Sequence, residues 1–558
     1  MKNINSWIHT LVIATVIGFI SVSCHKSMEG GVLDSSTSRS FTPTGLAIKT
    51  SRDTATITFS APLFAATGIS YTVDIAKDSS FSTIEYSVVT KKTSVVITDA
   101  NIQLITPYYA RVSANPYQSF AASRYLVKGT FKLLGLQYLK VIRDFEITSN
   151  SVLVHWYLNN NTNGATNFVL TTSGGSAPIN APVAANEVSA GAKIITGLAA
   201  GKKYNIQLFA GTKSLGTATI TTPPIVNFAT ILNAGVDDLA AAIAAASDGD
   251  VIGLNPGTYS LTSITPITKK TISIRSVSNN PTDTKILCRE LDIAGDGAGL
   301  TLAGLEMSGN YGGTSLGVAC LQLIGSPTSA TPSAFTNVKI DNCIIHDYAR
   351  YVLRGNAAAT ANDFKIGIIS INNSQIYNID QTSTTGYYTF ALERLQFDAF
   401  SLTKSTLYSS GNGMINVNAT LSTTAALPNI TIDYCTVNNI GGSNRYLLFD
   451  AGANNIKYSL TNSILANTPI NASVNTKASK GGGASILSFS YNNTFKFTST
   501  PNGLDLVLIS YTQDNNITQD LGWQPSTTNF SLSMLPSSNP VFSSSSTAGT
   551  LGDPRWAY

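Results

Sequence analysis

The stretch "ITIDYCTVNN", residues 430–439, decides the fold, because variants of it recur along the chain. Apolar and polar residues alternate through its first half, which is typical of a half-buried strand. Related stretches begin at residues 300, 338, 369, 400, 458 and 487, so the spacing settles near 30 residues. A fixed period of this length predicts a solenoid, in which each repeat buries the same face against its neighbours.

Positions within the repeat predict where the side chains point. The first and third positions are apolar and are expected inside: Val338, Ile369, Phe400, Ile430, Tyr458, Ile340, Ile371, Leu402, Ile432 and Leu460. The sixth is small, which indicates a tight inward corner: Cys343, Ser374, Ser405, Cys435 and Ser463. The two cysteines lie three coils apart, roughly 14 Å at parallel-strand spacing, so free buried thiols are expected. The fifth position holds asparagine at 342, 373 and 462, interrupted by Lys404 and Tyr434.

A single helix is expected before the repeats. Val236, Leu239, Ile243 and Ala246 recur at helical spacing, which predicts a short amphipathic helix at about residues 236–246. A helix followed by "GDVIGLNPGTY" resembles the N-terminal cap of right-handed parallel β-helices of the pectate-lyase-like superfamily. Such a cap covers the open apolar end of a strand stack. The resemblance implies a β-helix over residues 223–558, with coils from about 250 to the C-terminus.

Two modules precede the β-helix, at residues 43–131 and 132–222. Short alternating runs such as "TATITFS" and "YYARVSA" have the spacing of a β-sandwich. Their order resembles fibronectin type III domains, with Trp156 at that family's core tryptophan position and Phe59 in its place in the first copy. The overall fold class is therefore all-β. The resemblance implies spacer modules, and direct ligand binding by them remains an alternative.

The N-terminus predicts a membrane anchor. Lys2 precedes the apolar run "LVIATVIGFISVSC", which fits a secretory signal over residues 1–23. Its end resembles a bacterial lipobox, which implies that Cys24 is lipidated and that residues 24–42 form a tether. The implied location is the outer membrane, on the cell surface or the periplasmic face. A net charge of +4 on 558 residues, without a basic stripe, argues against nucleic-acid binding.

The terminal "LGDPRWAY" and the whole layout resemble lipoproteins of Bacteroidetes polysaccharide-utilisation systems. This resemblance implies a monomer that binds polysaccharide, with an acidic, uronate-containing glycan favoured by the basic residues described next. Two alternatives stay open. One is a polysaccharide lyase of the pectate, alginate or chondroitin lyase type that acts by β-elimination. The other is an adhesin or scaffold without glycan chemistry.

Charged residues between the repeats supply the candidate site. Arg354 and Arg394 are expected on neighbouring coils as an anion site, and Lys365 and Lys404 are expected to join them. Further glycan contacts are expected from Tyr387, Tyr388 and Arg445. In a lyase, the candidates for the base and for the group that neutralises the uronate are Arg354, Arg394, Lys365 and Lys404, with Ca²⁺ as a candidate cofactor.

The repeats contain few residues that could act as catalytic carboxylates or metal ligands. Asp341 and Asp433 occupy a corner of the repeat and are interpreted as turn residues, and Glu393 has no acidic partner nearby in sequence. This sparsity disfavours a hydrolase with paired carboxylates. His155 and His346 are interpreted as structural, and no metal site is predicted.

Overall fold

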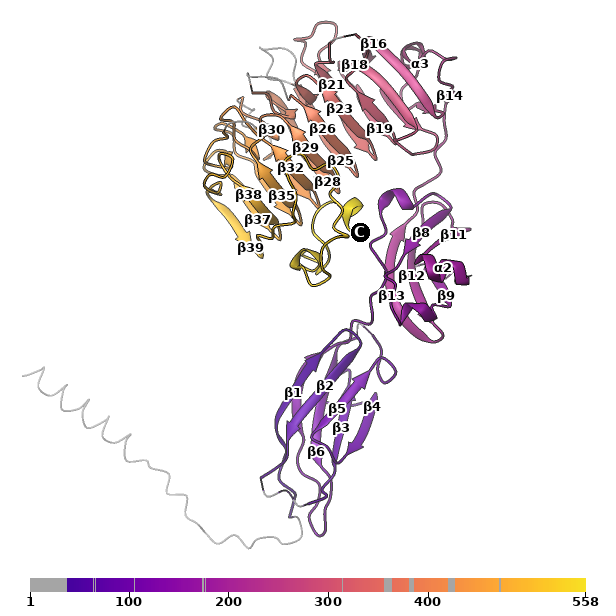
Figure 1. The fold of residues 1–558 in the computed structure, drawn as a ribbon, viewed down its shortest axis with the longest axis vertical. Coiled ribbons are helices and arrows are strands. Elements are labelled where there is room, and N and C mark those ends of the chain that lie inside the picture. The colour runs from indigo at the N-terminus through magenta and orange to yellow at the C-terminus, as the bar shows by residue number, and fades with distance from the viewer. Residues whose placement is uncertain are drawn as a thin grey trace, which may run out of the picture. The chain divides into compact units, whose positions relative to one another are not determined.

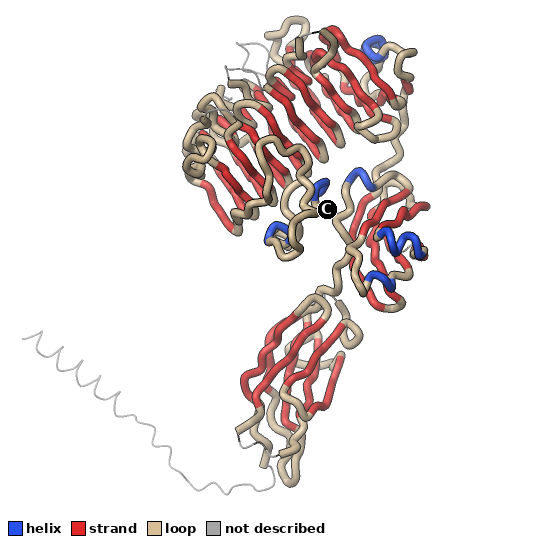
Figure 2. Tube along the Cα trace, viewed as in Figure 1, coloured by secondary structure: helices blue, strands red, loops and turns tan. Residues whose placement is uncertain are grey.

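The computed structural model describes residues 38–558, except 64, 66, 105, 173–174, 176, 314, 356–363, 381–385, 420–426 and 471–472. The signal, the lipidation site and most of the tether therefore lie outside the described residues. Strands predominate over helices throughout (Figure 2). The chain forms two compact units, the first comprising residues up to 137 with 212–216, and the second comprising 138–211 with 217–558.

The first module is a sandwich of two antiparallel sheets. One has the order β1–β2–β5 and the other the order β4–β3–β6–β7. The strands are β1 (Thr44–Thr50), β2 (Thr54–Ser60), β3 (Tyr71–Ala76), β4 (Tyr86–Thr90), β5 (Ser94–Thr98), β6 (Tyr108–Ala114) and β7 (Leu126–Phe131). Phe59 is buried edge-on against Tyr71. The Gln103 N–H donates to the Tyr108 hydroxyl at 3.0 Å, which is the tyrosine corner of this class of sandwich.

The second module repeats this plan with β8 (Ser151–His155), β9 (Asn167–Thr172), β10 (Ile179–Pro182), β11 (Ala192–Thr196), β12 (Lys203–Ala210) and β13 (Lys213–Thr221). Trp156 is 1% exposed and packs on Phe168, so it is a core residue as predicted. The Ala199 N–H donates to the Tyr204 hydroxyl at 2.8 Å. An unpredicted short helix, α2 (Ala185–Ala190), ends at Gly191, where the left-handed conformation with φ +63° suits glycine.

The β-helix begins with a strand and a capping helix. β14 (Thr230–Leu232) pairs with β15 (Val251–Leu254), and α3 (Leu239–Ala245) lies between them in sequence. Leu239 and Ile243 are buried in the core of the solenoid, which confirms the predicted cap. The predicted start was wrong, because Asp238 caps the N-terminus of α3 and leaves Val236 outside it, 81% exposed.

The parallel strands of the solenoid (Figure 1) form an 11-stranded sheet and a 15-stranded sheet. We call the 11-stranded sheet the first sheet, and the two arms of the 15-stranded sheet, which meet at β18, the second and third sheets. The first sheet contains β14, β15, β17 (Thr271–Ser276), β19 (Gly299–Ala303), β22 (Ala334–Asp341), β25 (Phe364–Asn372), β28 (Leu395–Thr403), β31 (Asn429–Asp433), β34 (Lys457–Thr461), β37 (Ile486–Ser490) and β39 (Tyr511–Asp514). The second contains β20 (Glu306–Ser308), β23 (Ile344–Tyr348), β26 (Gln375–Ile379), β29 (Thr406–Ser410), β32 (Thr436–Ile440), β35 (Ile464–Thr468) and β38 (Asn493–Phe497). The third contains β21 (Ala319–Ile324), β24 (Tyr351–Arg354), β27 (Phe390–Ala391), β30 (Ile415–Asn416), β33 (Phe449–Asp450) and β36 (Ser479–Lys480). The long strand β18 (Thr284–Ala294) joins the second and third sheets, with β16 (Gly257–Thr268) beside it.

The repeat buries the side chains that its periodicity predicts. The first-position residues Val338, Ile369, Phe400, Ile430 and Tyr458 are 0–1% exposed. Register places each of them opposite its equivalent in the next coil, so the columns are continuous. The structure therefore confirms that each coil buries the same face.

A ladder of small residues follows each first-sheet strand. The Cys343 N–H donates to Ser374 Oγ at 3.1 Å, and the Ser374 N–H donates to Ser405 Oγ at 3.0 Å. The Cys435 N–H donates in the same way to Ser463 Oγ at 2.9 Å. The small side chain thus supplies a buried acceptor for the preceding coil. Cys343 and Cys435 are free and buried, as predicted.

The corner residue of each repeat adopts the left-handed conformation. Asn342, Asn373, Lys404 and Tyr434 have φ between +46° and +52°. Asparagine tolerates this conformation better than lysine or tyrosine does, and the Asn373 amide also donates to Asn342 Oδ1 at 3.2 Å. Lys404 and Tyr434 occupy strained positions, and their side chains contact other parts of the chain.

The coils do not continue to the C-terminus, contrary to the prediction. After β39, residues 515–558 fold back and carry an isolated β-bridge from Ile517 to Asn493 and the short 3-10 helices η4 (Pro540–Phe542) and η5 (Pro554–Trp556). Phe530 of this segment packs on Tyr408, which points outward from the second sheet, and Trp523 packs on Phe530. This face of the solenoid is apolar, so the C-terminal segment removes it from water.

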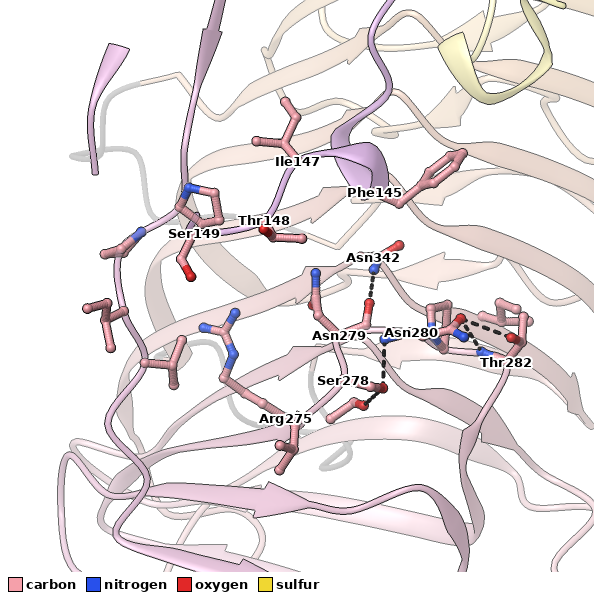
Figure 3. Close-up of a pocket in the computed structure, with 18 of the residues that line it drawn as sticks. Phe145, Ile147, Thr148, Ser149, Arg275, Ser278, Asn279, Asn280, Thr282 and Asn342 are labelled. Carbon is pink, nitrogen blue, oxygen red and sulfur yellow. Dashed lines mark hydrogen bonds between the residues drawn. The ribbon is translucent and has the colours of Figure 1, made fainter. Parts of the chain in front are cut away.

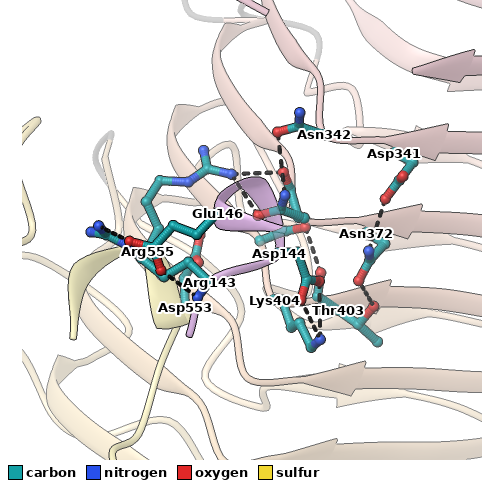
Figure 4. A network of polar contacts seen from close by, with 12 residues as sticks. Arg143, Asp144, Glu146, Asp341, Asn342, Asn372, Thr403, Lys404, Asp553 and Arg555 are labelled. Atoms are coloured by element: carbon teal, nitrogen blue, oxygen red, sulfur yellow. Dashed lines mark hydrogen bonds and ion pairs between the residues drawn. The ribbon is translucent and has the colours of Figure 1, made fainter. Parts of the chain in front are cut away.

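The second module is fixed to the β-helix within the same compact unit (Figure 4). The Lys404 amine contacts both carboxylate oxygens of Asp144 at 3.0 Å. The Tyr558 hydroxyl donates to Glu146 at 3.1 Å, and Glu146 is buried. The second module is therefore packed on the β-helix within one compact unit.

Candidate functional site

A row of polar side chains lies on the outward side of the third sheet. Register pairs Asp292 of β18 with Gln322 of β21, and Gln322 with Arg354 of β24. The preceding residue in each strand is a buried leucine, which directs the row outward. Successive members are about 4.8 Å apart along the solenoid axis. Arg354, predicted as a glycan contact, therefore belongs to a continuous row of polar groups.

Gln322 connects an acidic end of this row to a basic one. Its amide nitrogen donates to Glu290 Oε1 at 3.5 Å, and its Oε1 accepts from Arg354 Nη1 at 3.4 Å. Both bonds are long and hence weak. A ligand with stronger hydrogen-bonding groups can therefore displace them at small cost.

Glu290 and Asp292 form a buried carboxyl pair. The two residues are 6% and 7% exposed. Burial, then the charge of Asp292, raise the pKa of Glu290 to about 7, and burial raises the pKa of Asp292. Oδ1 of Asp292 has no hydrogen-bond partner within the described structure. Two carboxylates this close cannot both ionise readily, so Glu290 keeps its proton up to about pH 7.

An aromatic patch adjoins the arginine. The rings of Tyr351 and Tyr387 meet edge to face, with centroids 5.2 Å apart. The guanidinium of Arg350 lies 4.7 Å from the Tyr387 centroid, and that of Arg354 lies 5.8 Å from the Tyr351 centroid. Burial raises the pKa of Tyr351 to about 12, so its hydroxyl remains a donor at neutral pH. Rings and guanidinium groups together offer stacking, charge and hydrogen bonds.

The row extends through later coils with polar amides and acids. Ala391 follows Arg354, and Asn416 and Asp450 come next in register. The Asn416 amide donates to Glu393, which gives this glutamate a partner that its sequence neighbours do not supply. We call Glu290, Asp292, Gln322, Arg354, Arg350, Tyr351, Tyr387, Glu393 and Asn416 the third-sheet site.

The predicted group of four basic residues does not form as a whole. Arg354 and Arg394 lie on neighbouring coils, as predicted, but the two lysines lie elsewhere. Register pairs Arg354 with Ala391, and Arg394 lies three residues further on, in a turn with φ +57°. Lys365 belongs to the first sheet, where it pairs with Ala334 and Gln396. Lys404 is at a corner and is bound to Asp144. The prediction treated residues at similar repeat positions as neighbours, whereas each coil has three faces and assigns them to different ones.

The remaining predicted contacts differ in role. Tyr388 is 3% exposed, and its hydroxyl accepts the Tyr446 N–H at 3.2 Å, so it packs the loop instead of facing a ligand. Arg445 Nε donates to the Gly386 carbonyl at 3.0 Å and holds the same loop. Tyr387 is the one of these three that lies beside Arg350 and Tyr351. Cys24 lies outside the described residues.

Sequence reasoning missed the carboxyl pair. Glu290 and Asp292 occur in "CRELDIA", residues 288–294, ahead of the first recognisable repeat. The signal was present, since two acids alternate there with buried apolar residues in a strand. An acid at each of two alternate positions of a buried strand is rare enough to indicate a site.

The contacts of His346 are those of a structural residue, as its sequence context indicated. Its Nδ1 contacts Asp347 at 2.7 Å and its Nε2 contacts Glu306 at 3.0 Å, so both nitrogens are engaged. Its ring stacks on Tyr377 at 4.8 Å. Within the described residues, no three His, Cys, Asp or Glu side chains are grouped as metal ligands, so nothing there supports the Ca²⁺ expectation. No helix in the described part of the chain is long and apolar enough to span a bilayer.

Fold and site define a parallel β-helix protein with fibronectin type III-like modules and a polar, aromatic face on its third sheet. No protein-family profile matches the chain, and no curated protein matches it.

Solved structures show limited likeness. A two-domain fibronectin type III segment of chicken tenascin is 16% identical, over 32% of this chain and 99% of that one, with a TM-score of 0.16. The FN1–FN3 domains of chicken CNTN1 are 16% identical, over 34% of this chain and 68% of that one, with a TM-score of 0.15. A mutant of the PL6 family alginate lyase AlyGC is 14% identical, over 63% of this chain and 47% of that one, with a TM-score of 0.36. At these TM-scores, fold and function rest on the chain's own topology and contacts.

Proposed function

We propose that the protein is a lipid-anchored envelope protein that captures an acidic polysaccharide on its third-sheet site. The observation that carries this proposal is the cluster of Arg350, Arg354, Tyr351 and Tyr387 on the outward side of neighbouring coils. Guanidinium groups bind carboxylates through charge-assisted hydrogen bonds. Tyrosine rings present apolar faces and polar tips, which suit the mixed surface of a sugar.

The distribution of charge supports an acidic ligand at one part of the site. Arg350 and Arg354 place two positive charges beside the aromatic patch, whereas the carboxylate of Glu393 is bound by the Asn416 amide. Burial and the charge of Asp292 raise the pKa of Glu290 to about 7, so below that pH Glu290 keeps its proton. The retained proton also makes a carboxyl oxygen a hydrogen-bond donor. The solenoid axis runs along the row, so a linear polymer can contact several coils at once.

The test is retardation of the protein by uronate polymers in affinity gels, with a neutral polymer alongside. Arg354→Ala should weaken the retardation about 10- to 100-fold, the worth of one charge-assisted contact. Lys339→Ala, an exposed lysine on the first sheet, is the matched control and should leave it unchanged. If wild-type protein migrates alike in acidic, neutral and plain gels, capture of acidic glycan is wrong.

A second candidate function, β-elimination, is favoured by one observation. Glu290, with its pKa raised to about 7, lies one glutamine away from Arg354. A base poised near neutral pH can take the proton next to a uronate carboxylate while arginine neutralises that carboxylate. The electron pair then forms the sugar double bond as the glycosidic C–O bond breaks, and a proton goes to the leaving oxygen. If the wild type produces the absorbance of unsaturated uronates from a uronate polymer and Glu290→Gln does not, the protein is a lyase. A protein that only binds the polymer produces no such absorbance.

A further inference from the structure

A cavity lies away from the third-sheet site, where the second module meets the first coils (Figure 3). Its volume is about 770 Å³. One wall comes from the second module and the linker that follows it, and the other from residues 275–282 of the β-helix. The first wall contains Phe145, Ile147, Thr148, Ser149, Pro223, Pro224, Ile225, Val226 and Phe228. This volume lies within the usual range for small-ligand pockets of about 300–1,000 Å³.

The lining of this cavity carries a net positive charge. Arg275 and Arg555 line it, and no aspartate or glutamate does among the described residues. Arg555 donates to the carbonyl and the side-chain oxygen of Asn373. The Arg275 side chain makes no hydrogen bond or salt bridge within the described structure, although Asp341 lies near enough to interact with its charge. The half-buried guanidinium of Arg275 therefore has donors available for a ligand.

The rest of the lining combines apolar and hydroxyl or amide groups. Phe145, Ile225 and Val277 are 40%, 72% and 40% exposed, which is unusual for large apolar side chains. Ser278 and Asn280 add polar atoms, and the corner residue Asn342 fixes the loop by donating to the Asn279 carbonyl at 2.7 Å. A guanidinium, an apolar wall and several hydrogen-bonding groups together match a small ligand that has an anionic group, an apolar face and hydroxyls.

We propose that this cavity binds a short acidic saccharide, with its carboxylate on Arg275 and its apolar face against Phe145 and Ile225. This inference rests on the proposed function, because it assigns the same class of glycan to a second binding site. The two sites are formed by different sheets, and the cavity needs the second module for one wall. The second module is then part of a binding site as well as a connector.

The experiment is calorimetric titration of the full soluble chain with a hexuronate trisaccharide, beside the polymer gels described above. Arg275→Ala should raise the trisaccharide Kd about 10- to 100-fold. Ser149→Trp, which places a ring in the cavity from the module side, should do the same without removing a charge. Lys339→Ala should leave the trisaccharide Kd within about twofold, because Lys339 lies outside the cavity lining.

The outcomes separate the two proposals. If polymers retard the wild type but the trisaccharide does not bind, or binds equally well to Arg275→Ala and Ser149→Trp, the cavity proposal is wrong and glycan capture stands. If the trisaccharide binds in an Arg275-dependent way but no acidic polymer retards the wild type, capture on the third sheet is wrong and the cavity proposal stands. An equal loss in Lys339→Ala would indicate unspecific charge attraction and overturn the cavity proposal.

Discussion

Replacing Glu290 by glutamine should stabilise the protein at alkaline pH and leave it little changed at acid pH. Glu290 is 6% exposed and faces Asp292, and its pKa in the fold is about 7 instead of 4.5. The folded chain therefore holds this proton at pH values where the unfolded chain has released it. Between pH 4.5 and 7 the folded state binds more protons, so the free energy of unfolding falls as pH rises.

The magnitude follows from the size of the pKa rise. One pKa unit corresponds to about 1.4 kcal/mol, so a rise from 4.5 to about 7 costs the wild type about 3 kcal/mol once the pH exceeds 7. Most of this loss, about 2 kcal/mol, falls between pH 5 and 8. Glutamine keeps the shape and the acceptor oxygen used by Gln322, but it carries no charge to desolvate.

The assay is urea unfolding followed by circular dichroism at pH 5, 6, 7 and 8. The difference in unfolding free energy, Glu290→Gln minus wild type, should grow by about 2 kcal/mol across this range. Asp398→Asn, which removes an exposed carboxylate from the first sheet, should give a flat difference. A Glu290→Gln difference that does not change with pH would refute the proton-sharing pair.

Three further predictions concern the solenoid and the anchor. Ser405→Ala should lower the free energy of unfolding by about 1–3 kcal/mol, because the buried Ser374 N–H loses its acceptor; outward-facing Ser401→Ala in the same urea titration should change little. Cys288, Cys320, Cys343 and Cys435 are 0–1% exposed, and burial raises the pKa of Cys320 and Cys343 to about 12. A thiol reagent should therefore label these cysteines only in denaturant, and rapid labelling of native protein would contradict the buried ladder. Cys24→Ala should move the protein out of the membrane fraction or block its maturation, and an unchanged membrane partition in fractionated cells would exclude lipid anchoring through Cys24.

The sequence by itself determined the coil and its core. A period near 30 residues, with apolar first and third positions and a small sixth, allows one stacking arrangement, because each side chain must meet its own equivalent in the next coil. Phe400 and Ile430 are buried for this reason, and so are the free thiols of Cys343 and Cys435. The cores of the two sandwiches could also be predicted from short stretches of sequence, since Trp156 and the corner tyrosines Tyr108 and Tyr204 follow from short strand patterns.

Only the tertiary structure decided which charged groups meet. Repeat position does not say on which of three faces a residue between the repeats will lie, so Lys365 was wrongly grouped with Arg354. The pairing of Lys404 with Asp144 joins residues 260 apart in sequence and depends on how the second module packs on the coils. The Glu290–Asp292 pair also could not be predicted fully from the sequence. The alternation of the two acids is visible there. Their burial, which raises both pKa values, arises only when neighbouring strands enclose β18.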